Sequence, residues 1–443
     1  MAEFRHRSLE KPTSVRWAIF TLAWGTSWLL YLHRYIFALI KPKLAEEWGV
    51  STSELGLYDS VFSLFYTGFQ FPLGILADAI GVHVVLSTLI VVWSTGLAMQ
   101  AWAPEPGYLW YARALLGIGQ SAAFANINRI SRIWFPQSVR STLQGLTGVL
   151  AGRVGGLSAN LLFGFFMVGV LVMDWRNAVY VLALLGLCHA LLFGLLFRNA
   201  PRNHPGVNEA ERELIEGSEA EKPKASAPKI SVREMMSRTS LRGFLNLICL
   251  NVQTILSTFA DNIYSNWIPL FLFQVHALKF KEMGIYSALP LLGGALGGFI
   301  GGYLNDLLIA GTGNARWART GVAGIGKGMA AVMIFTALLW YDNPYIFCIF
   351  LFVVKLFGDW SLSTSWGVVT DIGGKATATV FAFNNSVAGI GSIVGPIIYG
   401  VLAQHFGWRI VFLTAGCAYV LCALSWLLID CTIPIIRESA QDK

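Results

Sequence analysis

The chain has 443 residues, of which 55% are hydrophobic and 13% are charged, and its formal net charge is +7. Soluble domains carry about a quarter charged residues, so this composition excludes a water-soluble globular protein and indicates a protein of the lipid bilayer. In a membrane protein, an excess of Lys and Arg is typical of the cytoplasmic loops. The positive net charge therefore indicates topology, and we expect no nucleic-acid partner.

Apolar runs of about 20 residues, the length that crosses a hydrocarbon core as a helix, recur along the chain. They are too long for the strands of a transmembrane barrel. The sequence therefore predicts an all-α integral membrane protein with about twelve spans, at residues 16–41, 54–78, 83–103, 108–133, 141–170, 177–197, 243–273, 283–309, 319–340, 344–370, 376–403 and 408–430.

Lys and Arg gather in the segments that share a side with the N-terminus, which predicts cytoplasmic N- and C-termini. The predicted domains are a six-helix bundle over residues 1–198, a polar cytoplasmic linker over 199–241 and a second six-helix bundle over 242–443. Within the linker, Asn208 and Glu211 have the spacing that caps a short helix.

Two short motifs occur twice, about half a chain length apart. Residues 74–78 (GILAD) return at 302–306 as GYLND, and the Trp-Arg pair at 175–176 returns at 408–409. A repeat in the same order within a hydrophobic chain indicates a carrier built from two matched halves, with a binding site between them.

The loop after the second span carries Gly74, Asp78 and Gly81 of a Gly-x-x-x-Asp-x-x-Gly motif. The fourth span carries Arg113 in an Arg-x-x-x-Gly-x-Gly pattern. On these residues and on the repeat, the chain resembles the major facilitator superfamily over nearly its whole length. The resemblance implies two six-helix pseudo-repeats and transport without a cofactor.

Finer resemblance divides between two groups of organic-anion carriers. Residues 31–39 look like the first span of the organophosphate antiporters, although Gly152 stands where that group has its substrate-site histidine. Residues 267–269 are similar to the anion:cation symporters, the group of hexuronate, galactonate and sialic acid transporters. Where those symporters usually place carboxylates in the first and fourth spans, this chain has His33 and Gln120.

Charged side chains inside the predicted spans are the best candidates for a transport site, because a lone charge at mid-membrane costs about 2.5 to 3.5 kcal/mol. We expect Arg34 and Arg153 to bind an anionic substrate, since a guanidinium can grip a carboxylate or phosphate with two hydrogen bonds. Structural pairing or helix packing is the alternative. The other predicted substrate contacts are Tyr31, Gln120, Tyr264, Lys355, Trp366, Asn384 and Asn385.

Three titratable residues are candidates for coupling transport to protons. Asp261 is the first choice, because burial favours its protonated form, and it stands where the glycerol-phosphate carriers have an arginine. Asp359 and His33 are the other two candidates. Asp359 lies four residues after Lys355, so an internal salt bridge between them is an alternative role.

Asp78 and Asp306 end the second and eighth predicted spans and are predicted to act in gating, as is Arg113. Arg113 and Asp59 lie near the outer ends of their spans, and Lys327 lies near an inner end. For these three residues we expect a side chain that reaches the membrane surface or a pair at a gate, rather than substrate contact.

The sequence thus predicts a secondary active transporter of a small organic anion, such as a sugar acid, driven by proton symport. The chain lacks a Gly-x-x-x-x-Gly-Lys phosphate loop and metal-type Cys spacing, so we expect neither an enzyme nor a metal site. An organophosphate:phosphate antiporter, a zwitterion carrier and a transporter-like membrane sensor remain alternatives. We expect a monomer in the cell inner membrane, with the anion, the proton and the lipid bilayer as partners.

Overall fold

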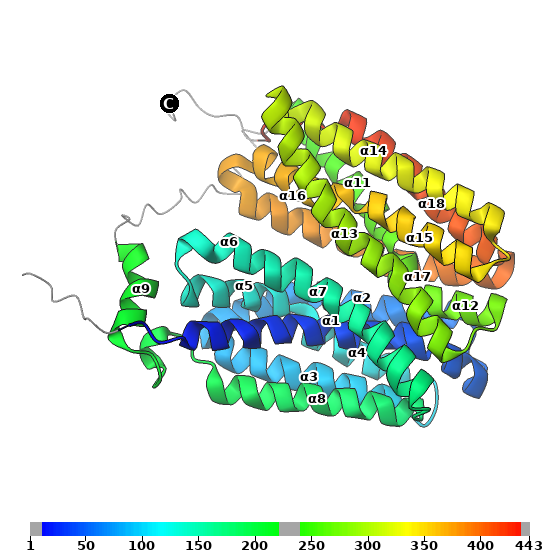
Figure 1. The fold of residues 1–443 in the computed structure, drawn as a ribbon, viewed down its shortest axis with the longest axis horizontal. Coiled ribbons are helices and arrows are strands. Elements are labelled where there is room, and N and C mark those ends of the chain that lie inside the picture. Colours follow the sequence, from blue (N-terminus) through cyan, green and yellow to red (C-terminus); the bar gives the residue numbers. More distant parts are fainter. Residues whose placement is uncertain (1–10, 221–239, 436–443) are drawn as a thin grey trace, which may run out of the picture. The chain divides into compact units, whose positions relative to one another are not determined.

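The computed structural model describes residues 11–220 and 240–435, and every regular element in these ranges is helical. Figure 1 shows the helices coloured along the chain. The predicted all-α fold is therefore confirmed, and each predicted span is occupied by one helix or by consecutive helices.

The helices before the second half follow the predicted spans and add a helix in the linker. They are α1 Val15–Trp48, α2 Thr52–Ile80, α3 Val82–Trp102, α4 Tyr108–Ser121, α5 Ala123–Trp134, α6 Gln137–Gly145, the π-helix η1 Leu146–Leu150, α7 Ala151–Ser158, the π-helix η2 Ala159–Val170, α8 Trp175–Leu196, η3 Pro201–Asn203 and α9 Glu209–Ala220.

The second half follows the same course. Its helices are α11 Leu241–Asn266, α12 Ile268–His276, α13 Phe280–Thr312, α14 Ala315–Ala337, η4 Leu338–Trp340, α15 Pro344–Gly358, α16 Trp360–Gly373, η5 Gly374–Ala376, α17 Thr377–Phe406 and α18 Trp408–Leu428.

Three of the spans that were predicted as continuous helices are interrupted. The fourth span divides into α4 and α5 at Ala122, the seventh into α11 and α12 at Trp267, and the tenth into α15 and α16 at Asp359. By length and composition, ten helical segments of the described chain can cross a membrane. The remaining spans are α1, which carries His33 and Arg34, and the α4–α5 pair, whose two helices are short.

The described residues divide into two compact units, and neither unit equals a sequence half. Of the described residues, 11–34, 65–156 and 176–220 belong to unit one. The described residues of unit two are 35–64, 157–175 and 240–435. The end of α1, the start of α2 and part of η2 therefore belong with the helices of the second half. The predicted boundaries at 198 and 242 follow the repeat and stay a prediction.

The linker helix α9 contains the predicted capping pair, and it also contacts the start of α1. Asn208 Oδ1 accepts a hydrogen bond from the Glu211 amide at 3.0 Å. The fully buried Glu211 accepts from the amides of Val15 at 3.3 Å and Arg16 at 3.1 Å, and from the Thr13 hydroxyl. It also forms an ion pair with the Arg16 guanidinium at 3.0 Å. Because the first amides of a helix have no partner within it, α9 supplies the N-terminal cap of α1.

Within unit two, glycines on α13 allow this helix to lie directly against α15. A Cβ atom at Gly293 would stand 2.2 Å from the Phe352 carbonyl oxygen, and one at Gly297 would stand 2.0 Å from the Leu356 carbonyl oxygen. Real side chains do not approach a backbone oxygen so closely, so these positions require glycine. This packing fixes the place of α15, the helix that carries Lys355.

We predict that Gly297→Ala destabilises the protein by about 1 to 3 kcal/mol, because the added methyl group must push α13 away from α15. Thermal unfolding in detergent measures the change. The matched control is Gly298→Ala, since a Cβ there meets only the Leu362 side chain at 3.9 Å. Equal melting temperatures for the two variants would contradict the packing argument.

Candidate functional site

Arg34, in the part of α1 that belongs to unit one, lies among aromatic and amide groups. Its guanidinium carbon is 5.0 Å from the centre of the Tyr31 ring and 4.6 Å from the centre of the Tyr66 ring. Its Nε donates a hydrogen bond to Gln120 Oε1 at 3.0 Å. We call these four residues the Arg34 cluster. It brings together three predicted substrate contacts and adds Tyr66, which the sequence analysis missed.

Gln120 fixes the position of the guanidinium from the end of α4. The side chain is fully buried, and its Nε2 donates to the Leu30 carbonyl oxygen at 2.9 Å. Since the amide nitrogen is committed to that carbonyl, the amide oxygen is the atom that faces Arg34. Gln120 precedes the interruption at Ala122 by two residues. The break in the fourth span therefore lies beside the cluster.

The glycine face of α7 makes room for Tyr31. A Cβ atom at Gly152 would lie 2.7 Å from the Tyr31 ring, and one at Gly155 would lie 2.4 Å from the Trp28 carbonyl oxygen. A larger residue at Gly152 would thus displace the ring that packs over Arg34. Arg153 is the next residue on α7 and is half-buried. The π-helices that flank α7 are of a kind often found at functional sites.

His33 is buried and faces α8. Its Nε2 lies 3.0 Å from the Leu182 carbonyl oxygen, to which it donates a hydrogen bond. Successive residues of a helix point about 100° apart, so His33 and its neighbour Arg34 present different faces of α1. The hydrogen bond gives His33 a structural role, and its part in proton coupling stays a prediction.

In unit two, Lys355 joins the two aspartates that the sequence marked for coupling. Its Nζ lies 2.7 Å from Asp261 Oδ1 and 2.5 Å from Asp359 Oδ1. The Tyr419 hydroxyl donates to Asp261 Oδ1 at 2.9 Å, and the Tyr264 ring centre is 5.4 Å from Lys355 Nζ. We call these five residues the Lys355 cluster. The salt bridge between Lys355 and Asp359 is thus present, and Asp261 shares it.

A second lysine borders this cluster. Lys327 donates to Ser257 Oγ at 2.8 Å, and its Nζ is 5.2 Å from the centre of the Tyr419 ring. With Lys355, it gives the neighbourhood two cations against the two carboxylates Asp261 and Asp359. The formal charges therefore balance when both carboxylates are ionised.

None of the three charged residues that were expected near span ends reaches the surface. Asp59 and Arg113 are 2% exposed and Lys327 is 1% exposed, so a side chain that extends to the membrane surface is excluded for all three. For Lys327 the reason is the length of its helix. The predicted span starts at residue 319, whereas α14 starts at Ala315, which places Lys327 near the middle.

Asp59 pairs with Lys41, a residue that the sequence analysis missed. Lys41 is fully buried, and its Nζ lies 2.5 Å from Asp59 Oδ2 and 2.8 Å from the Asn266 carbonyl oxygen. The Nζ is also 3.7 Å from the centre of the Trp267 ring. All these residues belong to unit two. The predicted first span ended at Lys41, but α1 continues to Trp48, so this cation lies within the helix and needs a partner.

Two other predicted contacts occupy different surroundings. Trp366 on α16 is exposed and packs against Phe381, with ring centres 6.2 Å apart. Asn384 on α17 donates to Asn251 Oδ1 at 3.1 Å and to Thr254 Oγ1 at 3.0 Å, both on α11. Asn384 thus joins two helices. The next residue, Asn385, is exposed, and substrate contact by these three residues stays a prediction.

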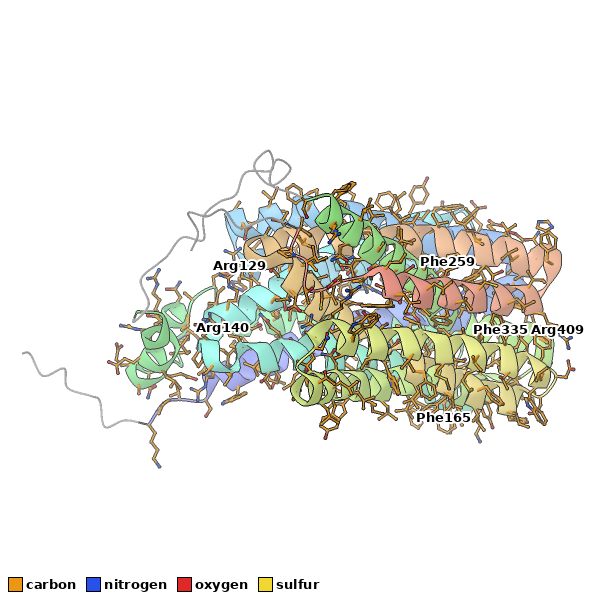
Figure 2. All side chains as sticks on the ribbon, turned by 90° about the horizontal axis from the view of Figure 1, so that it is seen from above. Arg129, Arg140, Phe165, Phe259, Phe335 and Arg409 are labelled. Atoms are coloured by element: carbon orange, nitrogen blue, oxygen red, sulfur yellow. The ribbon has the colours of Figure 1, made fainter. Side chains whose placement is uncertain are left out.

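The two predicted gating aspartates have different neighbours. Asp78 at the end of α2 forms an ion pair with Arg129 on α5, and Figure 2 shows Arg129 at one end of the helices. The loop positions Ala79 and Val82 supply no charge, so Arg129 provides the partner that the loop lacks. Asp306 on α13 is exposed and accepts a hydrogen bond from Asn305 at 3.4 Å.

The described residues offer no site for a metal ion, since no group of three or more His, Cys, Asp or Glu side chains converges there. The Arg34 cluster provides a guanidinium group, and the Lys355 cluster provides a lysine with two carboxylates. A guanidinium offers parallel donors that suit an anion, and a lysine shared by two carboxylates suits the binding and release of a proton.

The chain matches the profile of the Major Facilitator Superfamily over residues 23–336 and 307–439. A probable sulfoacetate transporter of Cupriavidus necator is 27% identical over 417 residues, which cover 94% of this chain and 93% of that protein. The hexuronate transporter of Escherichia coli K12 is 27% identical over 410 residues, which cover 91% of each protein.

Two solved structures have a similar fold. An inward-facing bacterial homolog of the human lysosomal transporter Spinster matches with a TM-score of 0.73 and 18% identity, over 94% of this chain and 95% of that one. A D-xylose-proton symporter matches with a TM-score of 0.72 and 16% identity, over 95% of this chain and 99% of that one. These likenesses confirm the fold, with about twelve membrane helices, and nothing finer.

We predict that Asp59→Asn destabilises the protein by about 3 to 5 kcal/mol, because it removes the carboxylate that is paired with the buried Lys41 ammonium. The double variant Lys41→Met/Asp59→Asn is expected to recover most of this loss. Thermal unfolding in detergent gives the comparison.

The control for this pair is Asp342→Asn, which removes an exposed partner of Arg409. Exposed pairs contribute at most about 1 kcal/mol, so the control should melt close to the unmodified protein. If Asp59→Asn behaved like this control, the buried pair would not have the role assigned to it.

Proposed function

The chain belongs to the Major Facilitator Superfamily, and we propose that it is a secondary active transporter that moves a small organic anion together with a proton by alternating access. It is a multi-pass membrane protein whose relatives are transporters rather than enzymes. Sulfoacetate and hexuronates, the cargoes named for two relatives, are small carboxylate anions. We propose the same chemical class for this chain, and the cell inner membrane as its place of action.

The observation that carries the proposal is the setting of Arg34. Its guanidinium is oriented by Tyr31, Tyr66 and Gln120, and these three neighbours are uncharged. A guanidinium that is held by an amide hydrogen bond and by two aromatic rings presents its planar donors in a fixed direction, which favours two-pronged recognition of a carboxylate or sulfonate. Gln120 and the tyrosine hydroxyls also offer partners for the hydroxyl groups of a sugar acid.

The Lys355 cluster supports coupling to protons. With both aspartates ionised, Lys355 and Lys327 are balanced by Asp261 and Asp359. A proton that binds Asp261 weakens its attraction for Lys355 and leaves the neighbourhood with one net positive charge. That charge favours the entry of an anion, and by linkage the anion favours binding of the proton.

The interruptions of the spans support alternating access. Discontinuous membrane helices commonly mark binding sites in transporters, since their broken backbones provide polar groups and points of bending. Here one interruption lies at Ala122, next to Gln120, and another lies at Asp359 itself. Both clusters therefore occupy positions where a helix can bend as the carrier changes state.

We predict that Arg34→Lys weakens the apparent affinity for the transported anion by roughly 10- to 150-fold, because a point charge replaces a two-pronged donor. Arg34→Ala and Arg153→Ala should abolish uptake. Uptake into proteoliposomes, with galactonate, glucuronate and sulfoacetate as cargoes, provides the measurement. Arg202→Lys, an exposed position in the linker, is the control. Normal uptake by the Arg34 variants would remove this residue from the substrate site.

We predict that Asp261→Asn abolishes accumulation driven by an acidic exterior and retains exchange of labelled for unlabelled cargo across the membrane. An amide cannot take up the proton, but it can still hydrogen-bond to Lys355. Asp342→Asn, at an exposed carboxylate, should leave both activities unchanged. An unaltered pH dependence in Asp261→Asn would exclude Asp261 from coupling, and phosphate-dependent exchange without any pH dependence would favour the antiporter instead.

A further inference from the structure

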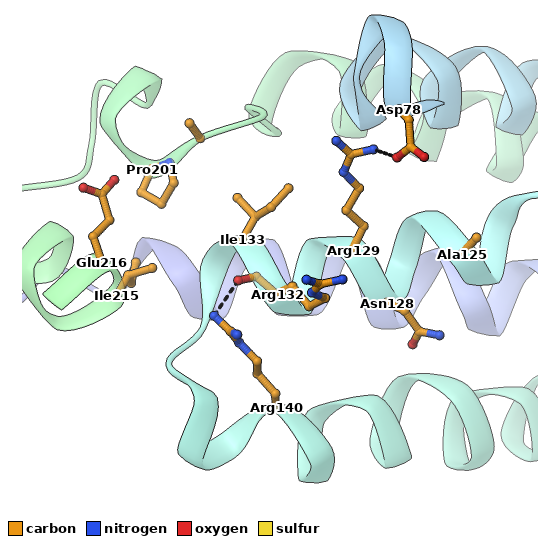
Figure 3. Close-up of a pocket in the computed structure, with 11 residues that line it drawn as sticks. Asp78, Ala125, Asn128, Arg129, Arg132, Ile133, Arg140, Pro201, Ile215 and Glu216 are labelled. Atoms are coloured by element: carbon orange, nitrogen blue, oxygen red, sulfur yellow. Dashed lines mark hydrogen bonds and ion pairs between the residues drawn. The ribbon is translucent and has the colours of Figure 1, made fainter. Parts of the chain in front are cut away.

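Cations that lie between helices meet carboxylates in both units. In unit one, Arg129 on α5 is directed at Asp78 on α2 (Figure 3). In unit two, Lys355 is shared by two aspartates. Lys327 on α14 differs from these cations. It is 1% exposed, yet its ammonium group forms no ion pair with any carboxylate of the described chain.

The two groups that contact the Lys327 ammonium are both neutral. Ser257 Oγ accepts its hydrogen bond at 2.8 Å, and the centre of the Tyr419 ring lies 5.2 Å from its Nζ. Burial of an ammonium group is costly unless charge and hydrogen bonds compensate for the lost water. One hydroxyl and one ring compensate only in part, so this position requires a further source of negative potential.

Asp261 is that source, because both contacts of Lys327 lead to it. Ser257 and Asp261 are four residues apart on α11, which places them on the same face of the helix. The Tyr419 hydroxyl donates to Asp261 Oδ1 at 2.9 Å, while the ring of the same tyrosine contacts Lys327. The charges of Lys327 and Asp261 attract each other across these two side chains.

A close helix contact fixes the position of Lys327 on α14. A Cβ atom at the preceding residue, Gly326, would lie 2.7 Å from the Phe357 carbonyl oxygen and 2.9 Å from the Trp360 Cβ. These two contacts stand on either side of Asp359, where the tenth span is interrupted. Because Gly326 lets α14 lie directly against this interruption, Lys327 is held beside the Lys355 cluster.

Few of the groups around Asp261 carry a charge. Besides Lys327, the titratable groups that surround it in the described part of unit two are Tyr264, Lys355, Asp359, Tyr399, Tyr419 and Cys422. Tyrosine and cysteine side chains are ordinarily neutral at physiological pH. The charges that act on Asp261 are therefore those of Lys355, Asp359 and Lys327. Lys355 divides its hydrogen bonds between two carboxylates, whereas Lys327 bonds to neither.

We propose that Lys327 is a positioning residue that acts on Asp261 and sets the proton concentration at which this carboxylate takes up and releases its proton. The inference rests on the proposed role of Asp261 in coupling. Lys327 supplies positive potential from one helical turn away, so it leaves the carboxylate oxygens to Lys355, to the Tyr419 hydroxyl and to the proton. A nearby cation favours the ionised carboxylate, so Lys327 favours release of the proton once it has been carried.

The test is a pH titration of the purified full chain in detergent, followed by infrared difference spectroscopy, which detects the C=O stretch of a protonated carboxyl group. The band of Asp261 is the one that Asp261→Asn removes. In Lys327→Met, this band should reach half of its intensity at about tenfold lower proton concentration, because the loss of a nearby cation favours the uncharged carboxyl group. Methionine has a similar volume, and such replacements of buried charge are often tolerated.

Two controls separate the charge of Lys327 from its packing. Lys327→Arg keeps the positive charge, so its titration should stay close to that of the unmodified protein. Lys281→Met makes the same charge change at an exposed position on α13, and it should leave the Asp261 band unshifted.

The proposal is overturned if Asp261 titrates alike in Lys327→Met and in the unmodified protein. It is also overturned if Lys327→Arg shifts the titration as far as Lys327→Met does, since the charge is then not the cause. Either result leaves the coupling role of Asp261 intact. That role fails separately if Asp261→Asn removes no band, and the inference about Lys327 then fails with it.

Discussion

Charge that lies inside a membrane protein has to be matched by the protein itself, and this requirement organises the structure. Transferring an unpaired ion out of water costs several kcal/mol. The chain meets the cost in two ways. Lys41 and Lys355 are each placed against aspartates, whereas Arg34 is placed among tyrosines and an amide. A lysine paired with carboxylates and an arginine bonded to an amide have different chemical uses.

A paired lysine and an amide-bound arginine respond differently to solutes. A cluster of one lysine and two carboxylates gains one positive charge when a carboxylate takes up a proton. The arginine keeps its charge at every physiological pH, so it can distinguish anions from neutral molecules. The proposed division of proton and anion recognition between two clusters accounts for the mixture of charges within the spans. An oppositely charged pair alone would have indicated packing.

Much of the fold could be predicted from local pattern, because apolar runs of membrane length are a strong signal. The pairing of Lys355 with Asp359 was also within reach, since the two residues are four apart on one helix. The contacts with Asp261, Lys41 and Lys327 were not, because they join distant segments and depend on where each helix ends. The interruption of the fourth span at Ala122 could not be predicted from the sequence, since alanine is a good helix former.

The two repeats of the chain begin their first helices in different ways. The second repeat starts α11 with its own Ser240, whose hydroxyl accepts from the Gly243 amide at 3.0 Å. The first repeat starts α1 with a carboxylate borrowed from the linker, through Glu211. The segment between α8 and α9 therefore has a minimum length, because a deletion there would pull the cap from α1. Through Glu211, the region that connects the two repeats completes the first helix of the first repeat.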